Sequence, residues 1–449
     1  MGVVFKEIYD QFPHEKVVGV FRMTTPCLFL RDLDVIKQVL IKDFDYFSDR
    51  GVSVGDKGLS NNIFHADTDK WRVLRNRFTP IFSSGKLKNM MYLLDECGDK
   101  FTLYLKEQCL TKREHDVHPL LQRYTMAAIS ACAFGLDIDT FKEKIDIWEK
   151  IDKLITTPTF VDELDMMFPG VLKKMNMEVF PTYLSGFFRQ VVATVIAQRN
   201  GVPSNRRDFM DLILELRQQG KIHSTRRYDD SEQIAVELTE DVIAALAFVF
   251  YAAGYETSAR TMTHMLYELA QNLEIQNKLV AEVDEVLKKH EGKITYETLN
   301  DMHYMKKVLD ETLRKYPVVD PLQRRAQADY KIPGTDVTVK KDQIVLISIL
   351  SIQRDAKYYP NPEKFDPERF SAENASSRHA CAYLPFGCGP RNCIGMRFGQ
   401  VQSFICLARL LSKFRVEPCN KTPPTIQFVA KRAILGAEGI YLNIIPRNN

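Results

Sequence analysis

The sequence predicts a mainly α-helical protein with a small β-sheet subdomain. Apolar residues recur at helical spacing over most of the chain from residue 34 onward, whereas strand-like segments are confined to the two ends and to residues 326–349. No internal repeat and no Pro/Gly/Ser-rich linker divides the 449 residues. We therefore expect one domain, residues 1–449, in which strands from distant parts of the chain form a small sheet beside a helical core.

The expected strands begin with a hairpin. Residues 17–21 and 27–30 are rich in β-branched and aromatic side chains, and a Thr-Thr-Pro turn separates them. Further strands are expected over 326–349, around an Ile-Pro-Gly turn, and near 425–445.

The expected helices occupy most of the remaining chain. The longest of them contains the longest apolar run, residues 242–253, which is too short to cross a bilayer and therefore predicts a core helix. Helices are expected near residues 87–110, 118–134, 141–156, 182–199, 206–219, 239–270, 272–291, 302–315 and 394–412.

Composition narrows the functional class. A formal net charge of only +3 argues against a nucleic-acid binder held by bulk electrostatics. The nine cysteines include no Cys-x-x-Cys pair, which indicates a reduced, intracellular protein rather than a disulfide scaffold. The first residues show neither a signal peptide nor a membrane span.

A glycine-rich loop over residues 385–395 presents Cys393 at the start of the last expected helix. The helix N-terminus and Arg391 should both favour a thiolate at this position. A thiolate facing an apolar slot suits a soft metal ion. The alternative is a buried structural cysteine, which is the commoner fate of a single cysteine.

The same loop has features that suit a flat, bulky ligand. Gly389 and Gly395 carry no Cβ, so the backbone can approach such a ligand closely. Phe386 would give the slot an aromatic wall, and Arg391 would offer a cation to an anionic group at the rim.

The helix expected over 239–270 carries Gly254, Glu256 and Thr257 in its apolar middle. A buried, unpaired carboxylate costs several kcal/mol, so an acid here is unusual. A locally widened helix would open a notch for a small molecule. The alternative is an ordinary helix–helix contact in which Thr257 bonds back to a carbonyl of its own helix.

Two further patterns are weak by themselves. Glu311 and Arg314 share a helical face and can pair, and Arg369 follows downstream. Trp71 and Arg75 also lie four residues apart on one helical face.

Two competing motifs fit poorly. Residues 51–55 match the Gly-x-Ser-x-Gly nucleophile elbow of hydrolases, but neither flank predicts the strand and helix that the elbow requires. The spacing of Cys381, Cys388 and Cys393 matches no usual zinc or iron–sulfur pattern.

The spacing Phe-x-x-Gly-x-Arg-x-Cys-x-Gly in residues 386–395 resembles the haem-binding loop of the cytochromes P450, which are haem-thiolate monooxygenases. The similarity covers essentially the whole chain and is greatest to the insect microsomal family six, which typically oxidises plant toxins and insecticides. It implies the cytochrome P450 fold, haem b as cofactor and Cys393 as the metal ligand. Phe386, Gly389 and Gly395 would then contact the haem.

The resemblance also implies roles for the other motifs. Thr257 would hydrogen-bond dioxygen, and Glu256 would belong to the proton-relay pair. The haem propionates would be held by Trp71, Arg75, Arg324 and Arg391. Glu311, Arg314 and Arg369 would form a buried structural triad without a catalytic role.

The implied reaction is insertion of one oxygen atom from O2 into a lipophilic substrate, either xenobiotic or endogenous. Electrons would come from NADPH through NADPH-cytochrome P450 reductase, with cytochrome b5 as a second candidate donor. A basic surface could receive the reductase, although solvated surface charge is the ordinary explanation. Its expected members are Lys70, Arg72, Arg77, Lys86, Lys88 and Lys413.

Two departures from that family matter. Its members begin with a membrane helix and a proline-rich hinge, and this sequence starts beyond both. Either the sequence is a truncated form, or the protein is held peripherally at the cytoplasmic side of the endoplasmic reticulum membrane by surface contact. Residues 161–188 are expected both to dip into the bilayer interface and to roof the substrate cavity. Asp320 replaces an apolar residue, and its carboxylate would either bind a basic substrate or point away from the cavity.

Two other functions remain as alternatives. One is a haem-binding protein without monooxygenase turnover, and the other is an enzyme of the same fold that isomerises peroxides. A proton relay at Glu256 and Thr257 argues against both.

Overall fold

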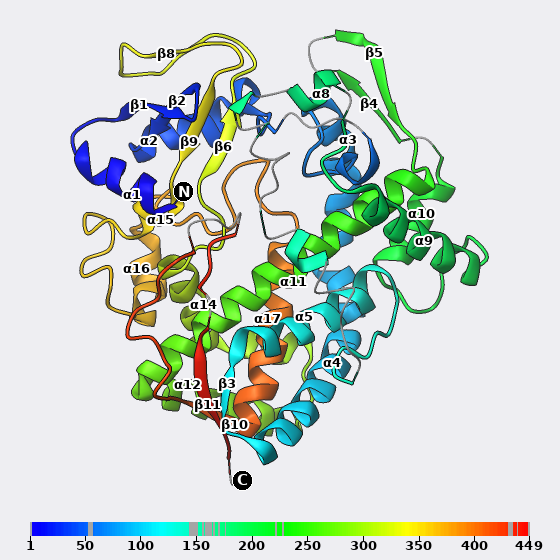
Figure 1. Ribbon diagram of the computed structural model, residues 1–449, viewed down its shortest axis with the longest axis vertical. Coiled ribbons are helices and arrows are strands. Elements are labelled where there is room, and N and C mark those ends of the chain that lie inside the picture. Colours follow the sequence, from blue (N-terminus) through cyan, green and yellow to red (C-terminus); the bar gives the residue numbers. More distant parts are fainter. Residues whose placement is uncertain are drawn as a thin grey trace.

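The molecule is arranged around one long helix, α11 (Glu240–Gln271), which crosses its centre in Figure 1. The helix begins where the Thr239 side chain accepts a hydrogen bond from the N–H of Val242 (3.3 Å). The computed structural model describes residues 2–52, 57–142, 151–154, 157, 164, 167–168, 171–175, 177–220, 222–226, 229–429, 434–437 and 439–447.

Other helices pack around α11 and bury its apolar side chains in a large core, as the helical periodicity predicts. Those nearest to it are α5 (Val117–Ala133), α9 (Thr182–Gln198), α14 (His303–Lys315) and α17 (Met396–Lys413). The remaining helices are α1 (Gly2–Gln11), α2 (Leu33–Lys37), α3 (Thr68–Phe78), α4 (Ser84–Thr111), α8 (Val171–Met175), α10 (Phe209–Gln218), α12 (Leu273–Lys289), α13 (Tyr296–Asp301), α15 (Ile349–Gln353) and α16 (Ala372–Ser376).

A four-stranded sheet joins distant parts of the chain, as expected. Its order is β1 (Val17–Arg22), β2 (Thr25–Leu30), β9 (Ile344–Ile347) and β6 (Leu322–Arg325). The first two strands are the expected hairpin, with Val17 opposite Leu30. Strand β2 runs parallel to β9, so the N-terminal hairpin is held by a strand more than three hundred residues later. The buried faces of these strands form a second apolar core.

The C-terminal strand belongs to a different sheet from the one that we expected. Strand β11 (Tyr441–Pro446) pairs with β10 (Phe414–Pro418) and β3 (Glu114–Asp116), and this sheet lies at the other end of the molecule from β1–β2 (Figure 1). Of the expected 425–445 segment, β11 is the part that forms a strand among the described residues.

Some elements were not predicted, and some expectations cannot be compared. Helix α1 was missed, as was the hairpin of β4 (Ile222–Arg226) and β5 (Asp229–Val236). The helix expected over 141–156 lies mostly outside the described residues, as does part of 161–188. The small pair β7 (Tyr330–Lys331) and β8 (Thr338–Val339) flanks the predicted Ile-Pro-Gly turn.

Helix α11 is the one helix in the described part of the chain that is long and apolar enough to cross a membrane. Most of its residues are buried inside the protein, including Ile243 and Leu246, which have no exposed area. It is therefore the core helix that its apolar run predicts.

Glu311, Arg314 and Arg369 form the expected buried triad. Arg314 donates to both carboxylate oxygens of Glu311 (2.6 and 2.9 Å), and Arg369 Nε lies 3.5 Å from Glu311 Oε1. Arg314 also donates to the carbonyl of Gln353 (2.8 Å) and to that of Pro362 (2.7 Å). The triad thus joins α14 to α15 and to the chain that leads towards the Cys393 loop.

Replacing Glu311 with alanine should lower the free energy of unfolding by about 3–5 kcal/mol, because Arg314 would remain buried without its counter-ion. Urea unfolding followed by circular dichroism measures this loss. The matched control is Glu297→Ala, which removes an exposed pair with Lys88 and should leave the unfolding midpoint unchanged. Equal losses in the two variants would contradict a structural role for the triad.

Candidate active site

The loop before α17 is fixed against the protein by its own backbone. The N–H of Cys393 donates to the carbonyl of Phe386 (2.8 Å), and Gly387 and Gly389 both adopt positive φ angles (73° and 74°). A Cβ at Gly389 would lie 1.9 Å from the carbonyl oxygen of Leu40, so this glycine allows the loop to contact the segment below it. By contrast, a Cβ at Gly395 would make only an ordinary van der Waals contact, with the Phe82 ring at 3.9 Å.

The Cys393 side chain is accessible to solvent, although it lies deep within the protein. Burial raises the pKa of the thiol, while the N–H of Gly395 and the guanidinium groups of Arg50 and Arg75 lower it. Arg391, which we expected to favour the thiolate, instead directs its guanidinium away from the sulfur. Its Nη2 donates to the Ala66 carbonyl (2.6 Å).

Arginines brace the loop from two sides. Arg75 Nη1 donates to the carbonyl of Asn392 (2.8 Å), and its Nη2 donates to the side-chain oxygen of the same residue (2.6 Å). The guanidinium of Arg391 lies 4.8 Å from the centre of the Trp71 ring, which is a cation–π contact. Arg324 is 3% exposed and donates to the carbonyl of Gln323 (2.8 Å).

The site holds more buried positive charge than nearby acids neutralise. Burial, together with the charge of neighbouring arginines, lowers the pKa of Arg391 to about 8, that of Arg324 to about 9 and that of Arg50 to about 10. The Nε atoms of these three arginines are buried without a hydrogen-bond partner among the described residues. Buried cations of this kind require anionic partners. The two propionates of haem b would supply them, so the residues fit that cofactor.

Arg50 was missing from the sequence prediction, which named Arg75, Arg324 and Arg391. Its Nη2 lies 3.4 Å from the carbonyl of Arg391, and its charge acts on Cys393. No sequence motif marked this residue.

One face of α11 is accessible in the middle of the core. Ala253 is exposed, and Val249, Ala252, Gly254 and Thr257 are partly exposed, while Tyr255, Glu256 and Ser258 are buried. The Thr257 hydroxyl donates to the carbonyl of Ala253 (2.6 Å). The helix is regular from Glu240 to Gln271, so the local widening that we expected is not present.

Glu256 lies on a different face of α11 and is fully buried in a polar network. Its carboxylate accepts hydrogen bonds from Arg260 Nε (2.7 Å) and Gln122 Nε2 (2.7 Å), and His118 Nε2 lies 3.3 Å from Glu256 Oε2. Burial alone would raise the pKa of Glu256, but the bonds and charges of His118 and Arg260 outweigh it and hold the pKa at about 2. Glu256 is therefore ionised at neutral pH.

The accessible face of α11 and the Cys393 loop lie in the same region. A Cβ at Gly399, in the first turn of α17, would lie 3.7 Å from Ser258 Oγ on α11. Phe82 approaches Gly395 and stacks edge-to-face on Phe250 of α11, with 5.3 Å between ring centroids. The structure thus brings the cysteine loop and the Thr257 segment together, although they are more than 130 residues apart.

His65 is a further candidate that no sequence pattern indicated. It is partly accessible, yet burial and the charge of Arg50 lower its pKa to about 4, so it is neutral. Its Nδ1 lies 3.0 Å from Asn62 Nδ2, and its ring lies 6.1 Å from that of Phe180. A neutral imidazole beside an aromatic ring suits the wall of a lipophilic cavity.

Asp320, another sequence candidate, has structural contacts of its own. The carboxylate of Asp320 accepts hydrogen bonds from the N–H of Leu350 (3.1 Å) and the hydroxyl of Ser348 (3.2 Å), so it stabilises the start of α15, and burial raises its pKa to about 6. Residues 53–55 of the proposed nucleophile elbow lie outside the described residues.

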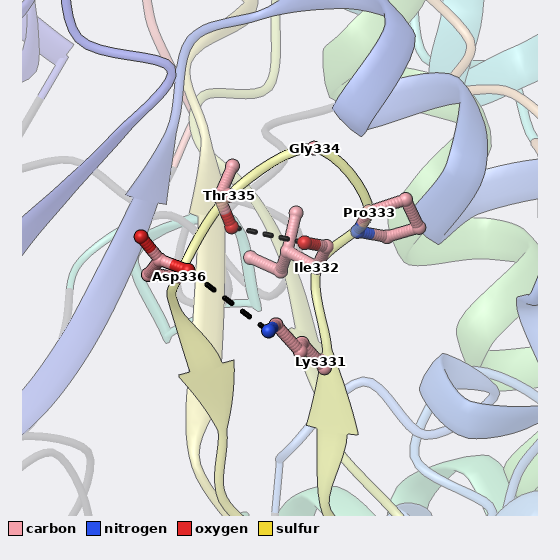
Figure 2. A pocket seen from close by; sticks show the side chains of 6 residues that line it. All are labelled: Lys331, Ile332, Pro333, Gly334, Thr335 and Asp336. Carbon is pink, nitrogen blue, oxygen red and sulfur yellow. Dashed lines mark hydrogen bonds and ion pairs between the residues drawn. The ribbon is translucent and has the colours of Figure 1, made fainter.

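A surface depression at the β7–β8 turn is unrelated to this chemistry. Figure 2 shows its six lining residues, in which the Thr335 hydroxyl donates to the Ile332 carbonyl (3.0 Å) and Lys331 faces Asp336 (3.9 Å). All six belong to one turn, and none is a predicted site residue.

The expected basic surface is partly neutralised by local acids. Arg77 and Lys413 are exposed. The paired members are Arg72 with Asp45 (2.6 Å), Lys86 with Glu215 (3.7 Å) and Lys88 with Glu297.

Comparison with known proteins agrees with this geometry. The family model "Cytochrome P450" matches residues 3–444. Cytochrome P450 6B2 of Helicoverpa armigera is 55% identical over 450 residues, which cover 100% of this chain and 89% of that protein. Cytochrome P450 6B1 of Papilio polyxenes is 53% identical, covering 99% and 89% of the two chains. Cytochrome P450 6a2 of Drosophila melanogaster is 38% identical, covering 95% and 86%.

The similarity extends over nearly the whole chain, and no finding favours haem binding without turnover. The predicted fold class and the resemblance to insect family six are confirmed. The family uses haem b, a flavoprotein reductase that passes on electrons from NADPH, and lipophilic substrates. The chain belongs to the cytochrome P450 family, and it is a haem-thiolate monooxygenase.

Proposed function

We propose that the Cys393 thiolate ligates the haem iron and that Arg50, Arg75, Arg324 and Arg391 hold the propionates. The observation that carries this proposal is the buried, under-neutralised guanidinium cluster around an accessible thiol. Trp71 would position Arg391 through its ring, and Gly389 would allow the loop to keep its place against the segment around Leu40.

Bound haem supplies the oxygen chemistry, and the protein supplies ligation, orientation and a dry site. We propose that Phe386 and Gly395 border the haem. The Gly395 N–H would donate a hydrogen bond to the Cys393 sulfur and stabilise the negative charge of its thiolate. The apolar side chains around Phe82 and Phe250 would exclude water from the same region.

We propose that Thr257 and Glu256 manage protons. The Thr257 hydroxyl reaches the accessible face of α11, where it would hold a proton on the side that faces the substrate cavity. Glu256 would act behind it as the acid of the relay. Because its carboxylate is held by Arg260 and Gln122, it would pass a proton only after one of these bonds opens. His118 Nε2 is close enough to Glu256 Oε2 to exchange a proton with it.

We propose that the substrates are flat, lipophilic xenobiotics or endogenous compounds. Aromatic side chains near the accessible face of α11 contact one another edge-to-face: Phe180 and Phe248 lie 4.8 Å apart, and Phe188 and Phe248 lie 5.1 Å apart. Such a wall favours planar apolar groups.

We propose that residues 1–449 act as one domain at the cytoplasmic side of the endoplasmic reticulum membrane, with cytochrome b5 as an additional electron donor. The Thr24 hydroxyl donates to the Met167 carbonyl (2.7 Å), which brings the β1–β2 turn beside residues 167–168. Apolar side chains are exposed in these segments and nearby, which suits contact with a bilayer surface. They are Phe21 (75%), Met23 (59%), Phe168 (55%), Met175 (60%) and Tyr183 (61%).

Replacing Cys393 with alanine should abolish the long-wavelength absorption band of the carbon-monoxide complex, because that band requires a thiolate opposite the gas. The reduced protein is titrated with carbon monoxide and scanned. Cys388→Ser, in the same loop, is the matched control and should keep the band. Persistence of the band in Cys393→Ala would overturn the assignment of the ligand.

Replacing Arg324 with glutamine should weaken haem binding about 10–100-fold, because one charge-assisted bond is worth about 1.5–3 kcal/mol. Titration of the apoprotein with haemin measures the affinity. Arg415→Gln removes a cation on the exposed strand β10 and serves as the control. Unchanged affinity in Arg324→Gln would place the propionates elsewhere.

Replacing Thr257 with alanine should uncouple NADPH consumption from product formation and release peroxide, because the proton donor on the accessible helix face is lost. The ratio of product to NADPH measures the coupling. Thr263→Ala removes the same kind of back-bond, to Ala259, from a buried position and should leave coupling intact. Equal coupling in the two variants would exclude Thr257 from proton delivery.

A further inference from the structure

Gly436, near the end of the chain, faces Arg260 of helix α11 at a distance that leaves no room for a side chain. A Cβ at Gly436 would lie 2.6 Å from Cδ, 2.7 Å from Nε and 2.8 Å from Cζ of Arg260. Non-bonded carbon atoms normally stay about 3.5–4.0 Å apart. Gly436 does not adopt a positive φ angle, so glycine is needed here for space and not for its backbone freedom.

The backbone around Gly436 is held in place on both sides. The N–H of Leu435 donates to the carbonyl of Val318 (2.8 Å), and the N–H of Val429 donates to the carbonyl of Gly436 (2.9 Å). Residues 435–437 are buried. A methyl group at Gly436 would therefore have to be accommodated by the Arg260 side chain rather than by the backbone.

Arg260 is held between this segment and Glu256. It is 1% exposed, and its Nη1 donates to the carbonyl of Ala437. Its Nε donates to Glu256 Oε1 (2.7 Å). The Nε that binds the carboxylate is thus one of the atoms that a methyl group at Gly436 would meet. A shift that relieves this contact would move the guanidinium away from Glu256.

The other polar groups around Glu256 do not replace this cation. On α5, Gln122 donates to Glu256 Oε2 (2.7 Å), and His118 Nε2 lies 3.3 Å from the same oxygen. On α11, the next turn beyond Arg260 carries His264, which is completely buried. Neither ring nitrogen of His264 has a hydrogen-bond partner in the part of the chain that the structure describes. Burial and the charge of Arg260 lower its pKa to about 3, so His264 is neutral.

We propose that Gly436 is a positioning residue for proton delivery, because it leaves room for the Arg260 guanidinium that fixes the Glu256 carboxylate. The proposal rests on the proposed role of Glu256 in the proton relay. A side chain at Gly436 would displace the guanidinium and leave the carboxylate without a fixed orientation. Proton delivery would become less reliable, and more reductant would be lost as peroxide.

The first test measures the contact without turnover. Urea unfolding of the ferric holoenzyme is followed by circular dichroism for the wild type, Gly436→Ala, Glu256→Gln and the double variant. In the wild type, Glu256→Gln leaves Arg260 buried without its counter-ion and should lower the folding constant at least about a hundredfold. In the Gly436→Ala background the pair is already broken, so the same change should cost less than about tenfold. Equal losses in the two backgrounds would overturn the proposal.

Gly85→Ala is the matched control for the added methyl group. A Cβ at Gly85, in the first turn of α4, would meet no atom within 4 Å. In the Gly85→Ala background, Glu256→Gln should keep its full effect on the folding constant. A reduced effect there as well would show that the method does not report the contact at Gly436, and the proposal would lose its support.

The second test measures the ratio of product to NADPH in the same variants, normalised to haem content. Gly436→Ala should lower this coupling at least about threefold, and it should cause no further loss in the Glu256→Gln background. A glycine with a purely structural role would lower the yield of holoenzyme but not the ratio. Normal coupling in Glu256→Gln would refute the relay itself, whereas a loss in Glu256→Gln but not in Gly436→Ala would refute the positioning role alone.

Arg260→Ala keeps the proposal testable if Gly436→Ala does not retain haem. This change removes the three Arg260 atoms that the methyl group would meet, so Gly436→Ala should fold in the Arg260→Ala background. Its coupling should then equal that of Arg260→Ala alone, which should itself fall below the wild type. Failure to fold, or a further loss of more than about twofold, would mean that the methyl group acts through other neighbours and contradict the proposal.

Discussion

The active site depends on positive charge that the protein buries without neutralising it. Arg50 lies close enough to lower the pKa values of Arg324 and Arg391, and Arg75 lowers that of Arg50. Arg50, Arg324 and Arg391 each leave a buried Nε without a partner in the described structure. Such an arrangement is unfavourable in the isolated chain. An anionic cofactor removes the penalty, so binding of the cofactor and stability of the folded site are linked.

This linkage explains why the arginines also hold the backbone. Arg75 bonds both the carbonyl and the side chain of Asn392, and Arg391 bonds the carbonyls of Ser48 and Ala66. Each cation therefore connects the Cys393 loop to an earlier part of the chain. Without the cofactor these cations would repel one another. The Cys393 loop would then lose the support of the arginines as well as its contact with the cofactor.

Sequence reasoning located the parts of the site that carry local patterns. The cysteine loop, the Glu256–Thr257 segment and the Glu311–Arg314 pair each have fixed spacing, and the structure brings the first two together. Pattern reasoning also found the N-terminal hairpin and most helices, because apolar periodicity reports local burial directly.

Pattern reasoning failed where the role of a residue depends on contacts with residues far away in the sequence. Nothing local distinguishes Arg50 from a surface arginine, and the side-chain direction of Arg391 is set by carbonyls more than 300 residues earlier. Strand β11 was assigned to the wrong sheet for the same reason, since its partner β3 lies near residue 115. For Asp320 the sequence left two roles open, a substrate ligand or a residue that points away from the cavity, and its bonds to Ser348 and Leu350 favour the second.

The network around Glu256 limits how protons can move. Arg260 binds Glu256 and also the carbonyl of Ala437, and a Cβ at Gly436 would lie 2.6 Å from Arg260 Cδ, so this guanidinium ties α11 to residues 434–437. The lowered pKa of Glu256 means that its ionised form stabilises the fold above the ordinary carboxyl range, and that this contribution fades as pH falls towards 2.

A carboxylate whose ionised form is stabilised in this way binds a proton weakly and releases it readily. In the proposed relay, a proton that reaches Glu256 must therefore be passed on quickly, or the bond to Arg260 must open first. Because Arg260 also holds residues 434–437, opening that bond would free this segment at the same moment. Proton delivery and the mobility of residues 434–437 should thus be coupled through one guanidinium group.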